Sequence, residues 1–301
     1  FMGFTMLAAF ALFFLRYGNL KSAQNLESAL SREVAFLVNN VLFLAIAFIT
    51  MWGAIFPLIT QVFRKQTVSI GAPFYNQVNG PLLLVLIFLM GIGPLLPWRN
   101  ASLGSLRRAI QTPGLTAIVV FGILLALGVY KPFALIAYSL CAFVAGGIVH
   151  EWVRGTRARH RRGENYAVAF GRLLAANRPR YGGYIVHLSI VALALGITGS
   201  SFYGVQRDVI LAPGQQVEVE GYTVEYVGTR VRALSDRTEF LNDLTVTRGE
   251  GEPKPMLAWR AFYPEQRMSA TRAAIRSTPI EDLYIVSSES LEDGRVAFRI
   301  L

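Results

Sequence analysis

The chain has 301 residues, of which 53% are hydrophobic and only 16% are charged, and its formal net charge is +10. This much apolar surface excludes a disordered or fibrous chain, because such chains stay solvated by being polar. One cysteine excludes an internal disulfide, and three histidines leave little material for a protein-only metal cluster. The sequence begins at Phe1 inside an apolar run, so we expect it to be a piece of a longer protein, truncated at its N-terminal side.

The distribution of charge argues against nucleic-acid binding. Residues 1–204 contain 17 basic and 4 acidic side chains, whereas residues 205–301 contain 12 and 15. The basic excess therefore lies between the apolar runs, as in membrane proteins whose cytoplasmic loops are positively charged. The sequence predicts contact with a lipid bilayer, no nucleic acid, and two domains: a transmembrane helical domain over 1–204 and a second domain over 205–301.

Six apolar runs predict an all-α polytopic membrane bundle. They cover roughly 1–15, 34–58, 82–98, 114–131, 133–152 and 182–203. A helix of about 20 apolar residues crosses the bilayer core. The loops at 16–32, 99–112 and 153–181 carry 14 basic residues, and the alternate loops carry three. This asymmetry predicts that the first set is cytoplasmic and that residues 205–301 lie outside.

Residues 205–301 predict a small external all-β domain, either a barrel or a sandwich. Apolar and polar residues alternate around Val217 and Val224, and Gly221 lies between these runs as a hairpin turn would. Further strand-like runs cover 238–247, 254–263, 282–288 and 295–301, which gives about seven short strands with a possible turn near 269–277.

His187 is the sharpest chemical signal, because it lies about five residues inside the sixth apolar run. An ionisable residue within a span is a functional candidate, and imidazole is a common axial ligand of haem iron. Gly183, one helical turn earlier, leaves room for a flat porphyrin beside an apolar wall. The alternative is a histidine that hydrogen-bonds to a neighbouring helix. Spacing alone leaves both interpretations open.

The predicted external loop at 66–81 is unusual for a helix connection. It contains Pro73, Phe74, Tyr75 and Asn76 between two glycines. These residues are either an aromatic anchor at the membrane surface or part of a surface for a ligand or partner. Cys141 is expected to be a packing residue, and His150 and His160 to be interfacial.

Three blocks of sequence resemble the CcmF family of bacterial cytochrome c haem lyase subunits. The first block is MWGAIFPLITQVFRKQTVSIGAPFYNQVNGP, followed by LMGIGPLLPWRN; the others are RYGGYIVHLSIVALALGITGSS and YPEQRMSATRAAIRSTPIEDLYIV. The resemblance implies a protein of the bacterial inner membrane with its β domain in the periplasm. It also implies an enzyme that forms thioether bonds between haem vinyl groups and the CxxCH cysteines of apocytochrome c.

The resemblance further implies a resident haem b, with His187 as one ligand of its iron, and several partners: a haem chaperone, apocytochrome c and other cytochrome c maturation subunits. The segment with Pro73 to Asn76 would wall the place where substrate haem meets apocytochrome. The second axial ligand, and further haem ligands of the family, would lie outside this chain, which is then only part of the catalyst. The alternatives are a membrane b-haem electron carrier, which would need His150 as a second ligand, and a haem transporter.

Overall fold

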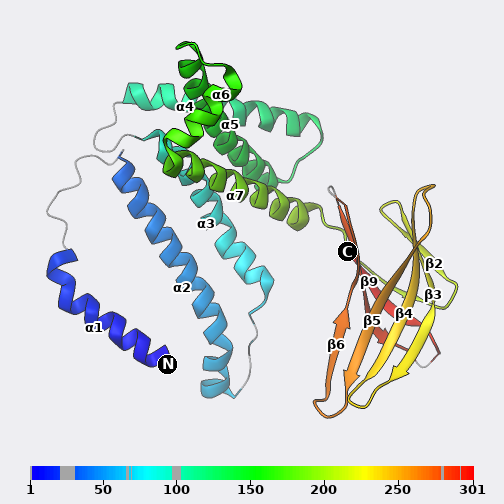
Figure 1. Ribbon diagram of the computed structural model, residues 1–301. Helices are drawn as coiled ribbons and strands as arrows, with labels where there is room; N and C mark the ends of the chain where they lie inside the picture. Colours follow the sequence, from blue (N-terminus) through cyan, green and yellow to red (C-terminus); the bar gives the residue numbers. More distant parts are fainter. Residues whose placement is uncertain are drawn as a thin grey trace. The chain divides into compact units, whose positions relative to one another are not determined.

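The computed structural model describes residues 2–20, 31–65, 68, 70–96, 103–278, 281–291 and 293–301 (Figure 1). Contacts between residues divide the chain into two compact units, Phe1–Phe202 and Tyr203–Leu301. The division falls two residues before the predicted boundary. Lys21 and Arg99, which were counted in the predicted cytoplasmic loops, lie outside the described residues.

The first unit is helical. Its elements are α1 (Met2–Leu20), α2 (Arg32–Arg64), α3 (Ala72–Ile92), the short 3-10 helix η1 (Gly93–Leu95), α4 (Leu103–Ala126), α5 (Pro132–His160), α6 (Tyr166–Ala176) and α7 (Arg178–Tyr203). Local sequence explains several of the ends. Ser31 caps α2 by accepting a hydrogen bond from the Val34 amide, and Pro132 begins α5, where a missing N–H costs little.

Five helices of the described residues are long and apolar enough to cross a membrane: α2, α3 with η1, most of α4, α5 and α7. The prediction of six spans is wrong by one. The first predicted run, at 1–15, lies in α1, whose apolar part, Gly3–Gly18, is not among these five helices.

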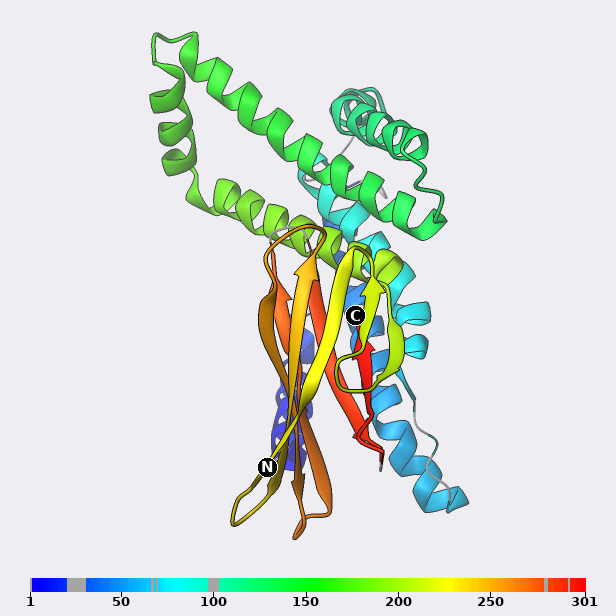
Figure 2. The same ribbon diagram turned by 90° about the vertical axis from the view of Figure 1, so that its right-hand side faces the viewer.

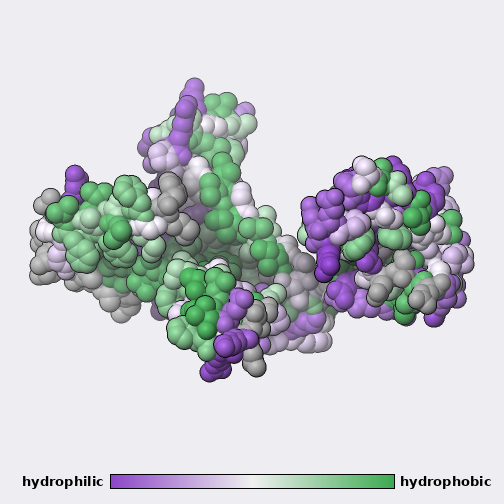
Figure 3. Space-filling view, turned by 90° about the horizontal axis from the view of Figure 1, so that it is seen from below, coloured by the Kyte–Doolittle hydropathy of each residue, from purple (hydrophilic) through white to green (hydrophobic). Residues whose placement is uncertain are grey.

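The surface of the helical unit is apolar. Large side chains such as Phe36, Leu44 and Phe63 are exposed, and Figure 3 shows apolar residues gathered over this unit, whereas hydrophilic residues cover much of the β domain. Lipid tails satisfy such a surface, so the pattern fits helices that lie in a bilayer. Inside, α5 packs against α3, α4 and α6, and the core is formed by Cys141, Phe143, Val144 and Ile148 of α5 with Leu173, Tyr181, Tyr184 and Val191.

Two predicted loops are largely helical. The basic segment 153–181 contains the last turns of α5, all of α6 and the start of α7; Asn165 caps α6 by accepting from the Ala167 amide (Figure 2). The external loop at 66–81 is helical from Ala72 onward, because Gly71 stands at the N-cap and Pro73 fits the first turn. The turn signals there mark the start of a helix.

The second unit is a sandwich of two antiparallel sheets (Figure 2). One sheet has the order β1-β9-β8-β7 and the other β2-β3-β4-β5-β6. The strands are β1 (Arg207–Leu211), β2 (Gln216–Val219), β3 (Tyr222–Ala233), β4 (Thr238–Arg248), β5 (Lys254–Tyr263), β6 (Met268–Arg272), β7 (Ala274–Ser277), β8 (Asp282–Ser290) and β9 (Val296–Ile300). The predicted all-β domain is thus confirmed, with strands β6 and β7 where a turn was expected.

The predicted hairpin at Gly221 is present. Val219 pairs with Tyr222, and the two residues between them, Glu220 and Gly221, have φ angles of 47° and 78°. Two positive φ angles suit the right-handed twist of the flanking strands, which explains the glycine. Alternation buries one face of each sheet, and the core includes Val224, Leu244, Ile285 and Phe298.

Candidate functional site

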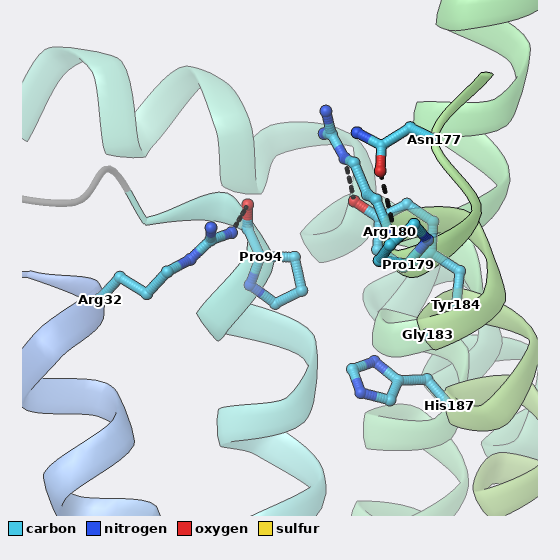
Figure 4. Close-up of a pocket in the computed structure, with 8 residues that line it drawn as sticks. All are labelled: Arg32, Pro94, Asn177, Pro179, Arg180, Gly183, Tyr184 and His187. Atoms are coloured by element: carbon cyan, nitrogen blue, oxygen red, sulfur yellow. Dashed lines mark hydrogen bonds between the residues drawn. The ribbon is translucent and has the colours of Figure 1, made fainter.

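Two cavities of the helical unit share residues around the start of α7. The smaller has a volume of about 490 Å³ and is lined by Arg32 of α2, Pro94 of η1, Asn177, and Pro179, Arg180, Gly183, Tyr184 and His187 of α7 (Figure 4). The larger has a volume of about 1210 Å³ and is lined by residues of α2, α3, α5 and α7. Arg32, Pro94 and His187 line both, so the histidine lies where the two cavities meet.

The imidazole of His187 is half-buried, and its Nδ1 atom is buried without a hydrogen-bond partner among the described residues. Figure 4 shows the ring directed away from α7, toward the side on which Arg32 and Pro94 lie. A buried polar atom normally has a partner, because leaving it unpaired costs free energy. Within the described part of the chain, Nδ1 therefore does not form the hydrogen bond to a neighbouring helix that the alternative interpretation requires.

Gly183 lines the smaller cavity one turn before His187. A Cβ atom built on this glycine would have no atom within 4 Å, so open space lies above its backbone. The larger cavity continues along apolar residues of the same helix, Ile190, Leu193, Ala194 and Ile197. A half-buried imidazole beside open space and an apolar wall fits a flat aromatic macrocycle bound through a ring nitrogen.

Two arginines fix the frame of this site. Arg32 donates from Nε to the Gly93 carbonyl at 3.1 Å and from Nη2 to the Pro94 carbonyl at 3.0 Å, which ties the start of α2 to the end of α3. Arg180 donates to Glu151 Oε2 at 2.7 Å and to the Tyr184 hydroxyl at 3.2 Å, which ties α5 to the start of α7. Glu151 is only 9% exposed, whereas the Arg180 side chain is 46% exposed, so the carboxylate is buried and the guanidinium reaches the surface.

The structure brings part of the predicted 66–81 surface to the same cavity as His187. Tyr75 and Asn76 line the larger cavity at the start of α3, whereas Pro73 and Phe74 are not among its lining residues. The Tyr75 ring packs against α2 at Gly53, where a Cβ atom would come within 2.8 Å of two ring carbons. A glycine is needed on α2 for this close approach.

The other residues that the sequence singled out, His150, His160 and Cys141, line neither cavity. His150 is exposed on α5 and lines neither cavity, and the ring of His160 stacks on Tyr166 with centroids 3.8 Å apart. Cys141 is buried at 2% exposure, with its Sγ 4.0 Å from the Val191 carbonyl, as expected of a packing residue. Within the described residues, no three His, Cys, Asp or Glu side chains gather as metal ligands.

Sequence reasoning missed Arg32 and Asn79. Arg32 was counted only as a loop charge, although Ser31 before it is a helix-cap signal. Asn79 lines the larger cavity and donates to the Thr50 hydroxyl at 3.4 Å, while its own Oδ1 is buried without a partner among the described residues. It lies in a segment for which the sequence predicts a loop.

Comparisons with known proteins agree on one family. Residues 202–301 match the family model described as the CcmF C-terminal beta-sandwich. Cytochrome c-type biogenesis protein CycK of Rhizobium meliloti is 30% identical over 97% of this chain and 43% of its own length. The protein CcmF of Haemophilus influenzae is 29% identical over 96% of this chain and 44% of its own length, and CcmF of Escherichia coli is 26% identical over 90% and 40%.

A solved structure, described as cytochrome c heme lyase CcmF, superposes with a TM-score of 0.67 and 25% identity over 91% of this chain and 42% of that one. The predicted resemblance is confirmed: nearly the whole chain is similar to the C-terminal half of CcmF proteins. The chain spans less than half the length of the curated relatives it matches.

Proposed function

We propose that this chain works in cytochrome c maturation as part of a haem lyase, and that it holds a b-type haem through the imidazole of His187. The observation that carries the proposal is the position of His187, half-buried where two cavities meet, with Nδ1 unpaired within the described part of the chain. The similarity to CcmF proteins over nearly the whole chain supports the haem-handling role.

Residues of this chain would bind and orient the haem. The His187 imidazole would hold the haem iron through a ring nitrogen, and Gly183 would leave room for the macrocycle. The apolar residues of α7 would exclude water from it. When bound, the haem supplies one-electron redox chemistry.

The reaction itself needs no protein nucleophile. Each cysteine thiol of the CxxCH segment adds across a vinyl C=C bond of the substrate haem, so that one C–S bond forms and the thiol hydrogen passes to the other vinyl carbon. The protein's contribution is to hold the two reactants in register. In this proposal Tyr75 and Asn76, at the opposite end of the larger cavity from Arg32, help to wall the place where substrate haem meets apocytochrome.

The proposed setting is the bacterial inner membrane. The helices α2, α3, α4, α5 and α7 would lie in the bilayer, with the basic segment at 153–181 in the cytoplasm and the β sandwich in the periplasm. The proposed partners are a haem chaperone, apocytochrome c and the other maturation subunits.

The decisive experiment replaces His187 with alanine in the full-length protein, with His150→Ala as the matched control. We expect His187→Ala to lose or strongly shift the b-haem absorbance at normal protein level, and His150→Ala to leave it unchanged, because His150 lines neither cavity. An unchanged spectrum in His187→Ala would refute the ligand assignment. Loss of the spectrum in His150→Ala would instead favour the electron carrier that uses both histidines.

A second experiment tests the far end of the cavity. The double substitution of Tyr75 and Asn76 by alanine should lower the yield of holocytochrome c while the b-haem spectrum and the protein level stay normal. Val78→Ala on α3 is the matched control, because Val78 does not line the cavity, whereas the ring of Phe74 packs edge-on against Tyr75. A normal yield from the double variant, or the same loss from Val78→Ala, would contradict this role.

A further inference from the structure

The guanidinium of Arg32 lies on the wall of both cavities that His187 lines. We propose that Arg32 binds the carboxylate side chains of the haem held by His187 and so fixes which edge of the macrocycle faces the end of α3. This inference rests on the proposed haem ligation. It adds a charged anchor, supplied by a different helix, to a site that the sequence indicated only through a histidine and a glycine.

The local structure places Arg32 rigidly. Ser31, which is 2% exposed, accepts a hydrogen bond from the Val34 amide at 3.3 Å and so fixes the first turn of α2. The guanidinium is then held by the two carbonyls of Gly93 and Pro94. Figure 4 shows the Arg32 side chain reaching from α2 toward Pro94, on the side of the cavity that the His187 ring faces.

The chemistry of this position favours an anion. A guanidinium carries five N–H donors in a planar fork, a geometry that matches the two oxygens of a carboxylate. Arg32 also stands in the first turn of α2, where the helix dipole adds positive potential. Haem carries two carboxylates on one edge, and among the described residues that line the larger cavity Arg32 is the one with a permanent positive charge.

Arg180 also lines the smaller cavity, where its guanidinium donates to Glu151 at 2.7 Å and to the Tyr184 hydroxyl at 3.2 Å. Those contacts tie α5 to α7. Arg180 does not line the larger cavity, whereas Arg32 lines both. Of these two arginines, Arg32 is therefore the one that lines the same two cavities as His187.

The test compares two probes on the full-length protein in detergent after haem removal: haemin, and haemin dimethyl ester, in which both carboxylates are blocked. Binding is followed through the spectral signal that His187→Ala lacks. We expect the unmodified protein to bind haemin at least about tenfold more tightly than the ester, since hydrogen bonds to charged groups are worth about that much. Arg32→Gln should abolish most of this preference. Arg64→Gln, which makes the same charge change at the other end of α2, should keep it.

The outcomes separate this inference from the proposed function. Equal binding of the two probes by the unmodified protein would overturn the role of Arg32, even if Arg32→Gln failed to fold. So would an undiminished preference in Arg32→Gln. An unchanged spectrum in His187→Ala would instead overturn the haem ligation on which the inference rests. A preference for haemin over its dimethyl ester that is lost in Arg32→Gln and kept in Arg64→Gln would support the role of Arg32.

Discussion

The contact between Gly53 and Tyr75 makes a quantitative prediction about how α2 and α3 hold the cavity. In Gly53→Ala the new methyl carbon would lie 2.8 Å from the Tyr75 Cε1 and Cζ atoms, and closer still to its hydroxyl oxygen. Carbon atoms pack best about 3.5–4.0 Å apart, so the ring or the helix must move by about 1 Å. Overpacking of this kind costs about 1–3 kcal/mol of stability.

Replacing glycine with alanine also raises helix propensity, which stabilises the protein and opposes the cost of overpacking. A control variant must separate these two contributions to the unfolding free energy. Alanine favours a helix over glycine by about 1 kcal/mol, which would mask part of the cost. Gly122→Ala on α4 is the matched control, because a Cβ at Gly122 would have no atom within 4 Å. The difference in unfolding free energy between the two variants isolates the overpacking, and we expect Gly53→Ala to be the less stable by about 1–3 kcal/mol.

The assay is unfolding of the purified protein in mixed micelles, titrated with denaturing detergent, for both variants and for each combined with Tyr75→Ala. Removing the ring should rescue Gly53→Ala and leave the effect of Gly122→Ala unchanged, since only the first pair is in contact. If the two glycine variants differ by less than about 0.5 kcal/mol, which is ordinary additivity error, the proposed steric contact does not exist in solution.

Three further predictions concern the β domain. Hydrogen bonds from Arg237 and, to a lesser degree, from Arg232 hold the pKa of Glu239 below its usual 4.5. The stability that this adds is present above that value and is lost as the pH falls through the lower pKa of the folded state. In an acid titration, the stability of Glu239→Gln should therefore depend less on pH than that of the unmodified protein. Phe298→Ala should cost about 3–5 kcal/mol by denaturant titration, because the ring is 1% exposed in the sandwich core; a cost below about 1 kcal/mol would contradict that packing. A cysteine at Gly249 should be labelled from outside in spheroplasts while one at Gly163 is protected, and the reverse pattern would invert the proposed topology.

Elements with a strong local period could be predicted from the sequence. The alternation around Val217 and Val224, with a glycine between the runs, placed the hairpin of β2 and β3 correctly, because one buried face per strand fixes the register. The five spans were recognised because lipid requires long apolar helices. The strands at 268–277 were missed because their side chains are mostly exposed and give no alternating pattern.

The start of α3 shows why signals at the ends of elements mislead. Gly71 and Pro73 are residues typical of a turn, and the sequence predicted a loop there. The same two residues also suit a helix that begins with an N-cap glycine and a first-turn proline. A contact with another helix favours the second arrangement, because Tyr75 packs on Gly53 of α2. Such a contact between distant segments cannot be read from local sequence.

In the candidate site, too, local sequence could identify one residue but not another. His187 could be singled out from the sequence because an ionisable residue inside an apolar run is rare, and depth in a helix is a local property. Arg32 could not, because its charge looked like that of any loop arginine. Its place on the wall of the cavities that His187 lines depends on α2 meeting the end of α3, through the carbonyls of Gly93 and Pro94.

The polarity of the larger cavity gives a physical reason for the orientation of a haem bound there. Arg32 supplies a positive charge at the end where α2 begins, whereas Asn76 and Asn79, toward the other end, are neutral amides. The carboxylates of haem lie on one edge of the macrocycle and its vinyl groups lie away from that edge. A carboxylate gains far more from a guanidinium than from an amide, because charge-assisted hydrogen bonds are about twice as strong as neutral ones. Arg32, and not the two amides, would therefore hold the carboxylate edge of a haem bound there.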